Sequence, residues 1–147
     1  LVQPHLDAPD ISYVGPVGPA ERDALLGGAL ALLHLIDFAE PFGLSVVESL
    51  ATGTPVIAYP LGSMPEIIRP GRTGFLVDDV DGAVEAVDRV GSLSRRRCRD
   101  DVEERFTAAR MVADYAELFA RVASASSRST RSGMSTKANR TDASLAP

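Results

Sequence analysis

The sequence has few of the residues that mark a disulfide scaffold, a thiolate metal cluster or a membrane protein. It contains one cysteine and no tryptophan, and aromatic residues make up 5% of its 147 positions. A single cysteine excludes an internal disulfide framework and any metal cluster built on several thiolates. No apolar run reaches the roughly 20 residues that a membrane-spanning helix needs. With 45% hydrophobic residues, the chain can instead bury an ordinary core.

The beginning of the chain lacks both an initiator methionine and the basic stretch that opens a secretory signal. Residues 1–5 read Leu-Val-Gln-Pro-His. A length of 147 residues allows one domain of ordinary size. We therefore expect a cytoplasmic protein, and a chain that is a fragment beginning partway through a longer polypeptide.

Charge is unevenly placed along the chain. Before Ser124 there are 11 Lys and Arg against 19 Asp and Glu, and from Ser124 onward 4 against 1. An acidic body argues against a nucleic-acid partner, because phosphates would be repelled. Residues 123–147 are rich in serine and threonine without an apolar period, so we expect a disordered tail. Its basic excess is a weak signal for contact with an anionic membrane surface.

Residues 1–122 alternate β-rich runs with helical patterns, which predicts an α/β fold with a parallel, doubly wound sheet. The expected strands lie at 11–14, 30–36, 55–59 and 75–77. Helices are expected at 19–28, 43–51, 64–68, 81–90 with Asp81 as the cap, from Ser94 through the Arg-rich segment, and 107–122. A complete sheet of this type has five or six strands. The pattern therefore predicts a partial, Rossmann-like domain.

The segment between Asp37 and Val56 carries the most chemical information. It runs from a strand through a loop into a helix, and this corner is where open α/β sheets bind ligands. Gly43 permits close backbone approach, and the first-turn amides that follow it form an anion site. On a helical path, the Cα atoms of Glu40 and Glu48 lie on the order of 10 Å apart. Two carboxylates so placed could flank a diphosphate and accept hydrogen bonds from hydroxyl groups at either end.

The ordered motifs of this region resemble the retaining glycosyltransferases of family 4, which have the GT-B fold. Glu40-Pro-Phe-Gly-Leu, continued to Glu48, matches that family's E-x7-E motif. The likeness continues through Thr-Gly-Thr-Pro-Val, Pro65-Glu66 and the block from Gly71 to Val77. It implies that residues 1–122 form the nucleotide-sugar-binding, C-terminal half of such an enzyme, and that an N-terminal GT-B domain is missing here.

The resemblance also implies a role for each matching position. Glu40, the catalytic position, would contact hydroxyls of the donor sugar, and Glu48 would hold the ribose of the nucleotide. Amides around the remaining donor-binding positions would face the diphosphate: Phe42, Gly43 and Leu44. The implied reaction is hexosyl transfer from a nucleotide-sugar to an acceptor hydroxyl with retained anomeric configuration. No enzymic nucleophile, metal or cofactor is expected.

Two departures from the family pattern bear on this expectation. Gly62-Ser63 stands where the family has a Gly-Gly pair, a change expected to narrow the turn. The Arg and Lys that family members carry earlier in the domain, to neutralise the diphosphate, have no counterpart in this chain. We therefore expect the isolated chain to be inactive.

The sequence is compatible with two other interpretations. One is a non-catalytic, truncated module that binds a nucleotide or pairs with a partner, and the other is part of a GT-B-fold nucleotide-sugar epimerase. Asp79-Val-Asp81 matches a metal-binding D-x-D pattern, but a turn with a helix cap is favoured. The donor nucleotide stays open among UDP, GDP and ADP, and the acceptor is unknown.

Two further expectations concern packing. Cys98 lies among four arginines on a helix that we expect to be solvated, so its thiol should be at the surface. The apolar stripe from Met111 to Val122 has 3- and 4-residue spacing, which is typical of a helix face packed on a core.

Overall fold

The computed structural model describes residue 6 and residues 8–134. The chain divides into two compact units, Leu1–Arg105 and Phe106–Pro147, each described here by itself. No cis peptide bond occurs in the described residues.

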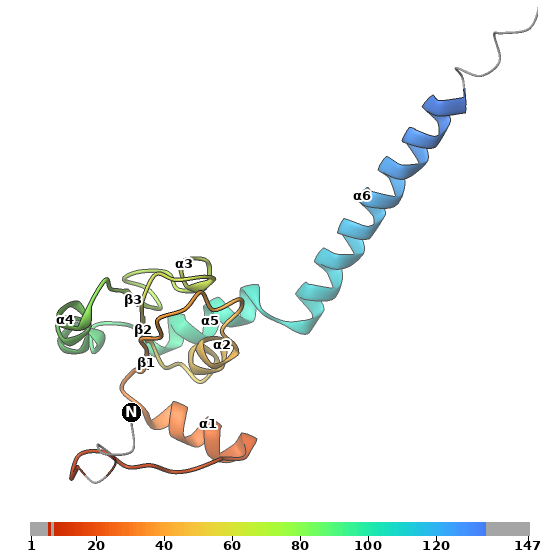
Figure 1. Ribbon diagram of the computed structural model, residues 1–147. Coiled ribbons are helices and arrows are strands. Elements are labelled where there is room, and N and C mark those ends of the chain that lie inside the picture. The colour runs from red at the N-terminus through yellow and green to blue at the C-terminus, as the bar shows by residue number, and fades with distance from the viewer. Residues whose placement is uncertain (1–5, 7, 135–147) are drawn as a thin grey trace, which may run out of the picture. The chain divides into compact units, whose positions relative to one another are not determined.

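The first unit is built on a parallel sheet of three strands, β1 (Leu32–His34), β2 (Val56–Ala58) and β3 (Gly74–Leu76), in the order β1-β2-β3 (Figure 1). In the register Leu33 pairs with Ile57, which in turn pairs with Phe75. These strands confirm three of the predicted runs, and with them the α/β fold with a partial doubly wound sheet. The first two strands are shorter than predicted, and the third is shifted by one residue.

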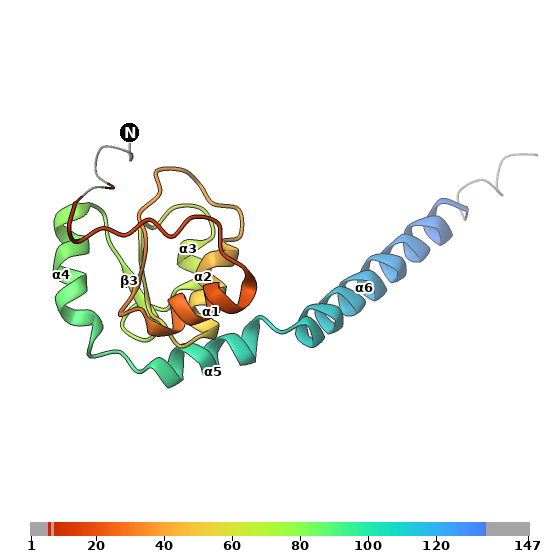
Figure 2. The same cartoon turned by 90° about the horizontal axis from the view of Figure 1, so that it is seen from below.

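Helices cover both faces of this sheet. In chain order they are α1 (Pro19–Gly28), α2 (Leu44–Ala51), α3 (Met64–Ile67), α4 (Val80–Val90) and α5 (Arg95–Arg105). Figures 1 and 2 show α4 on the opposite side of the sheet from α2 and α5. Ile57 and Phe75 pack with Val90 on the α4 side, whereas fully buried Leu50 lies on α2. Because successive strand residues point to opposite faces, β2 contributes to both layers.

The predicted strand at 11–14 is not present. In the part of the chain that the structure describes, residues 8–18 contain neither helix nor strand, and Ile11, Tyr13 and Val14 are exposed. The local composition favoured a strand, but a strand also needs a neighbour that accepts its backbone hydrogen bonds. Within the described residues β1 pairs with β2, and its other edge has no strand beside it.

The start of α4 differs from the expectation by two residues. Asp79, not Asp81, is the N-cap, and its Oδ1 accepts a hydrogen bond from the amide of Gly82 at 2.8 Å. Asp81 lies in the first turn, where its negative charge favours the positive end of the helix dipole. The D-x-D pattern is thus a turn and a helix cap, as favoured from the sequence.

Cys98 contradicts the expectation of a surface thiol. Its side chain is fully buried, and the thiol donates a weak hydrogen bond to the Thr73 carbonyl oxygen at 3.9 Å. Burial raises the pKa of this thiol, an effect only partly opposed by the positive charge of Arg95. The Arg-rich sequence around Cys98 indicated a solvated helix and did not reveal that one helix face points inward.

A buried carboxylate fastens α5 to the segment between α3 and β3. The side chain of Asp101 is fully buried, and its two oxygens lie 3.0 Å from Arg69 Nη1 and 2.7 Å from Arg105 Nη1. Arg105 also donates hydrogen bonds to the carbonyl oxygens of Ile67 and Glu66. A buried charge is tolerated only with such partners.

The second unit contains α6, which runs from Ala108 to Met134. Thr107 directly precedes it, and the Thr107 hydroxyl accepts a hydrogen bond from the Arg110 amide at 3.2 Å. It continues beyond the predicted end at Val122 into the segment expected to be disordered, and Ser124 donates a hydrogen bond to the Ala120 carbonyl oxygen at 2.8 Å. The rest of the expected tail, 135–147, lies outside the described residues.

Within the second unit, the side chains of the predicted apolar stripe of α6 are exposed. They are Met111, Tyr115, Leu118, Phe119 and Val122. Periodicity identified the stripe correctly but does not show what, if anything, covers it. Among the described residues, none of the helices combines the length and apolar character required of a membrane span.

Replacing Asp101 with Asn should lower the free energy of unfolding by roughly 3 kcal/mol, because Arg105 and Arg69 lose their charged partner in a buried setting. Asp100→Asn is the matched control, since Asp100 pairs with Arg96 at the exposed surface. That change should cost less than about 0.5 kcal/mol. Urea unfolding followed by circular dichroism measures both, and equal losses would contradict a special role for Asp101.

Cys98 should react with iodoacetamide only when the protein is unfolded, because its thiol is buried in the folded state.

The stability of the protein should also depend on the ionisation of Cys98. Because the folded state holds the thiol protonated, the contribution of Cys98 to the free energy of unfolding is fully present below the ordinary thiol pKa. The contribution should be lost as the pH rises above that value toward the raised pKa of the folded state. The stability difference between wild type and Cys98→Ala should therefore shrink at alkaline pH, and a difference independent of pH would count against this account.

Candidate functional site

The connection between β1 and α2 is shaped by an interaction of Glu40 with Gly43. The Glu40 carboxylate accepts a hydrogen bond from the Gly43 amide at 3.2 Å, so two of the expected site residues are brought together. Gly43 is the N-cap of α2 and has a φ of 79°, in the left-handed region. A Cβ at this position would lie 2.6 Å from the terminal methyl of Met64. Backbone conformation and space therefore both favour glycine here.

The first turn of α2 presents amides that are available to a ligand. Within the described residues the amides of Leu44 and Ser45 have no hydrogen-bond acceptor, whereas Val46 and Val47 donate to the Gly43 carbonyl oxygen. Unsatisfied amides at a helix start, aligned with the positive end of the dipole, attract anions. The Leu44 side chain is exposed beside them. This helix start can hold a phosphate group without a cationic side chain.

The β2–α3 loop is bound directly to the backbone of Glu40. The Glu40 carbonyl oxygen accepts hydrogen bonds from the Ser63 amide at 2.9 Å and from the Ser63 hydroxyl at 3.0 Å. A Cβ on Gly62 would lie 2.3 Å from that same oxygen, so the two loops touch only because position 62 is glycine. Ser63, the departure from the Gly-Gly pair, adds a hydroxyl hydrogen bond that glycine could not make.

Glu48 lies in the second turn of α2, and its carboxylate faces α1. Its Oε1 is 2.7 Å from Arg22 Nη1, with both side chains about one-third exposed. The structure thus places Glu48 on the helix whose start carries the available amides. It pairs Glu48 with Arg22, a residue that the sequence analysis did not single out. The Arg22–Glu48 spacing carries no local sequence signal, because it depends on how α1 and α2 pack.

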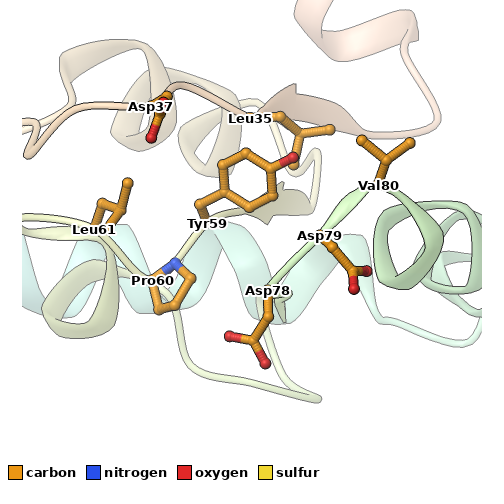
Figure 3. Close-up of a pocket in the computed structure, with 8 residues that line it drawn as sticks. All are labelled: Leu35, Asp37, Tyr59, Pro60, Leu61, Asp78, Asp79 and Val80. Atoms are coloured by element: carbon orange, nitrogen blue, oxygen red, sulfur yellow. The ribbon is translucent and has the colours of Figure 1, made fainter.

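An open hollow of about 610 Å³ lies at the carboxyl ends of the strands (Figure 3). Its lining residues follow all three strands: Leu35, Asp37, Tyr59, Pro60, Leu61, Asp78, Asp79 and Val80. Figure 3 shows the Tyr59 ring near the centre, with Asp37 and Asp78 on opposite sides of it. None of the five expected site residues lines this hollow. The rule that ligands bind beyond the carboxyl ends of parallel strands could have identified it from the sequence.

The two parts of this edge differ in charge. The start of α2 offers amide dipoles, whereas three aspartates are among the residues that line the hollow: Asp37, Asp78 and Asp79, the last of which also caps α4. Carboxylates accept hydrogen bonds and repel anions, so hydroxyl-rich or cationic groups suit the hollow. Across the described residues, no group of three or more His, Cys, Asp or Glu is arranged to hold a metal ion. The edge can therefore bind an anion at α2 and hydroxyl groups at its carboxylates.

Comparison with protein families finds a match over residues 5–105 to the family described as glycosyl transferases group 1. The matched residues coincide closely with the first unit, which contains the sheet, the start of α2 and the acidic hollow.

Two curated relatives illustrate the likeness in sequence. A D-inositol 3-phosphate glycosyltransferase of Streptomyces scabiei is 45% identical over 76 residues, which cover 52% of this chain and 17% of the relative. An N-acetyl-alpha-D-glucosaminyl L-malate synthase of Bacillus anthracis is 32% identical over 111 residues, covering 70% of this chain and 29% of the relative. The chain thus spans less than a third of either relative.

A solved structure confirms the fold. The sucrose-phosphate synthase of Thermosynechococcus elongatus superposes with a TM-score of 0.70 at 24% sequence identity, covering 84% of this chain and 33% of that one. At this identity the likeness concerns the fold alone, and it agrees with the expected half of a GT-B fold.

Alanine at Gly62 should destabilise the protein more than alanine at Gly71. Both glycines have a left-handed φ, but a Cβ on Gly71 meets nothing within 4 Å. Backbone strain alone should cost Gly71→Ala about 1–2 kcal/mol, and the clash with Glu40 should cost Gly62→Ala about 2 kcal/mol more. Thermal and urea unfolding measure the difference, and equal losses would show that the loops can move apart freely.

Proposed function

The chain belongs to the glycosyl transferases group 1 family, and we propose that it forms the donor-binding part of a transferase that uses a nucleotide-sugar. The observation that carries this proposal is the family match over residues 5–105, the unit in which the available amides of α2 lie at the carboxyl edge of the sheet. Because the chain spans a minor share of its relatives, the activity, acceptor and location of the complete protein are part of the proposal.

In this proposal the start of α2 receives the diphosphate of the donor. The amides of Leu44 and Ser45 donate to phosphate oxygens, and Gly43 lets those oxygens approach the backbone. Phe42 stands immediately before this turn with an exposed ring. The placement is supported by charge, because the acidic hollow nearby would repel the same phosphates.

Glu40 and Glu48 then bind the hydroxyl groups on either side of the diphosphate. Glu40 contacts hydroxyls of the transferred sugar, and its hydrogen bond from the Gly43 amide fixes the carboxylate at the start of α2. Glu48, one and a half turns further on, holds the ribose. Both are acceptors of hydroxyl hydrogen bonds, the role for which an ionised carboxylate is suited.

The proposed reaction is hexosyl transfer to an acceptor hydroxyl with retained configuration, in the manner of family 4. Glu40 has a binding role in this scheme and is not a nucleophile. The leaving phosphate, held by the α2 amides, assists deprotonation of the acceptor. No metal takes part, and UDP, GDP and ADP remain candidate nucleotides. A cytoplasmic location and a further GT-B domain that binds the acceptor complete the proposal.

A second function requires only the anion site at the start of α2. The available amides of Leu44 and Ser45 can hold the phosphates of a nucleotide whether or not transfer follows. In that case this chain is a binding module, and catalysis needs residues supplied by another segment. Turnover of a nucleotide-sugar by the isolated chain would exclude this function.

Replacing Glu48 with Gln in the complete enzyme should raise the donor KM by about 10- to 100-fold, because the amide loses charge-assisted hydrogen bonds to the ribose. Glu103→Gln is the control: Glu103 is an exposed residue of α5 that pairs with Arg99, and its loss should leave the KM unchanged. Donor kinetics with UDP-, GDP- and ADP-glucose supply the measurement.

Product analysis by NMR separates the proposed reaction from its alternatives. A glycoside with the anomeric configuration of the donor supports retaining transfer. An isomerised nucleotide-sugar with no transferred product would instead identify an epimerase. An unchanged donor KM in Glu48→Gln would contradict the assignment of Glu48 to ribose binding.

A further inference from the structure

Arg22 holds a fixed position between two carboxylates. It lies in α1, and its Nη1 is 2.7 Å from Glu48 Oε1. Its Nε and Nη2 donate to Asp23 Oδ1 at 3.2 and 3.0 Å. Each of the three guanidinium nitrogens therefore faces a carboxylate oxygen. Asp23 accepts hydrogen bonds from two of these nitrogens, and the third forms an ion pair with Glu48.

The contact with Glu48 lies apart from the interactions that hold the C-terminal end of α1. There, Arg95 donates to the carbonyl oxygens of Gly27 and Ala29, and the Thr54 hydroxyl donates to that of Leu26. None of the ten residues of α1 is buried, so these polar contacts set where the helix lies. They therefore also set where Arg22 lies, and a control for Arg22 has to be taken from a helix other than α1.

We infer that Arg22 is a positioning residue for Glu48 in donor binding. This inference rests on the proposed function and deepens it. Arg22 forms an ion pair with Oε1. Among the described residues Oε2 accepts no hydrogen bond, so it can accept one from a ribose hydroxyl. An unrestrained glutamate on a helix has several rotamers. If one rotamer is fixed before the ligand arrives, binding no longer includes the entropic cost of ordering the side chain.

Geometry favours this role over direct contact with the donor phosphates. Nη1 is engaged by Glu48, and the fork with Asp23 occupies the other two nitrogens. The amides of Leu44 and Ser45, by contrast, have no acceptor among the described residues. A phosphate therefore has amides available without displacing Arg22 from its two carboxylates.

The test compares binding of ribose and 2′-deoxyribose nucleotides to the complete protein by isothermal titration calorimetry. UDP, GDP and ADP are titrated first, and the one that binds most tightly is compared with its 2′-deoxy counterpart. The ratio of the two affinities reports the hydroxyl contact of Glu48 and is insensitive to general loosening of the site. Variants are Arg22→Ala, Arg22→Lys, Glu48→Gln and, as the control for loss of an arginine ion pair elsewhere, Arg96→Ala. Arg96 is exposed on α5 and pairs with Asp100.

We expect wild type to prefer the ribonucleotide by about 10-fold or more, the effect of one charge-assisted hydrogen bond. Arg22→Ala and Glu48→Gln should both bring the ratio close to one while binding of the deoxynucleotide changes little. Arg22→Lys should give an intermediate ratio, because an ammonium cannot contact Asp23 and Glu48 as a planar fork does. The Arg96→Ala control should keep the wild-type ratio.

Contradicting outcomes distinguish the inference from the proposed function. If Glu48→Gln loses the ratio but Arg22→Ala keeps it, Glu48 binds ribose without help and the inference is wrong. An equal loss of affinity for both nucleotides in Arg22→Ala also overturns it, because Arg22 then acts on phosphate or on folding. If Glu48→Gln keeps the wild-type ratio, or if wild type binds none of the three nucleotides, the proposed function itself fails and the inference with it.

Discussion

The geometry of the candidate site depends on a close approach of two backbone segments at the carboxyl edge of the sheet. The Glu40 carbonyl oxygen receives two hydrogen bonds from Ser63, and glycine at position 62 leaves the space for them. This contact fixes the loop that ends at Gly43, where the chain turns into α2 through a left-handed residue. The direction of the α2 amides, the Glu40 carboxylate and the wall of the acidic hollow all follow from that turn.

A short helix can organise such a site because its start and its second turn offer different chemistry. The first turn of α2 presents amides, whose dipoles favour an anion. The second turn presents Glu48, and its charge is compensated by Arg22 on a neighbouring helix. Helix α2 is itself anchored by fully buried Val46 and Leu50, so both features are held by the core.

Much of the fold was predictable from the sequence, because the signals for it are local. Three strands were located by continuous apolar runs, and the turn before α2 was indicated by Gly43. The strand expected at 11–14 failed because pairing requires a neighbouring strand, which composition does not reveal. The prediction of a surface thiol at Cys98 was wrong for a related reason. Four neighbouring arginines indicated a solvated helix, although one face of that helix packs inward. The same distinction applies to the candidate site. The contact of Glu40 with Gly43 is local in sequence and was predictable, whereas the contact of Arg22 with Glu48 arises only from tertiary packing.

The distribution of charge at this edge has a structural origin of its own. Polar residues that directly follow buried strands are brought to one edge, and in this chain those after β1 and β3 are aspartates. A helix that begins at the same edge turns the positive end of its dipole toward them. An anion bound at α2 is therefore repelled from the hollow, whereas hydroxyl groups can be accepted by its carboxylates. A ligand that carries both phosphate and hydroxyl groups would thus be oriented by electrostatics, with its phosphates at the amides and its hydroxyls at the carboxylates.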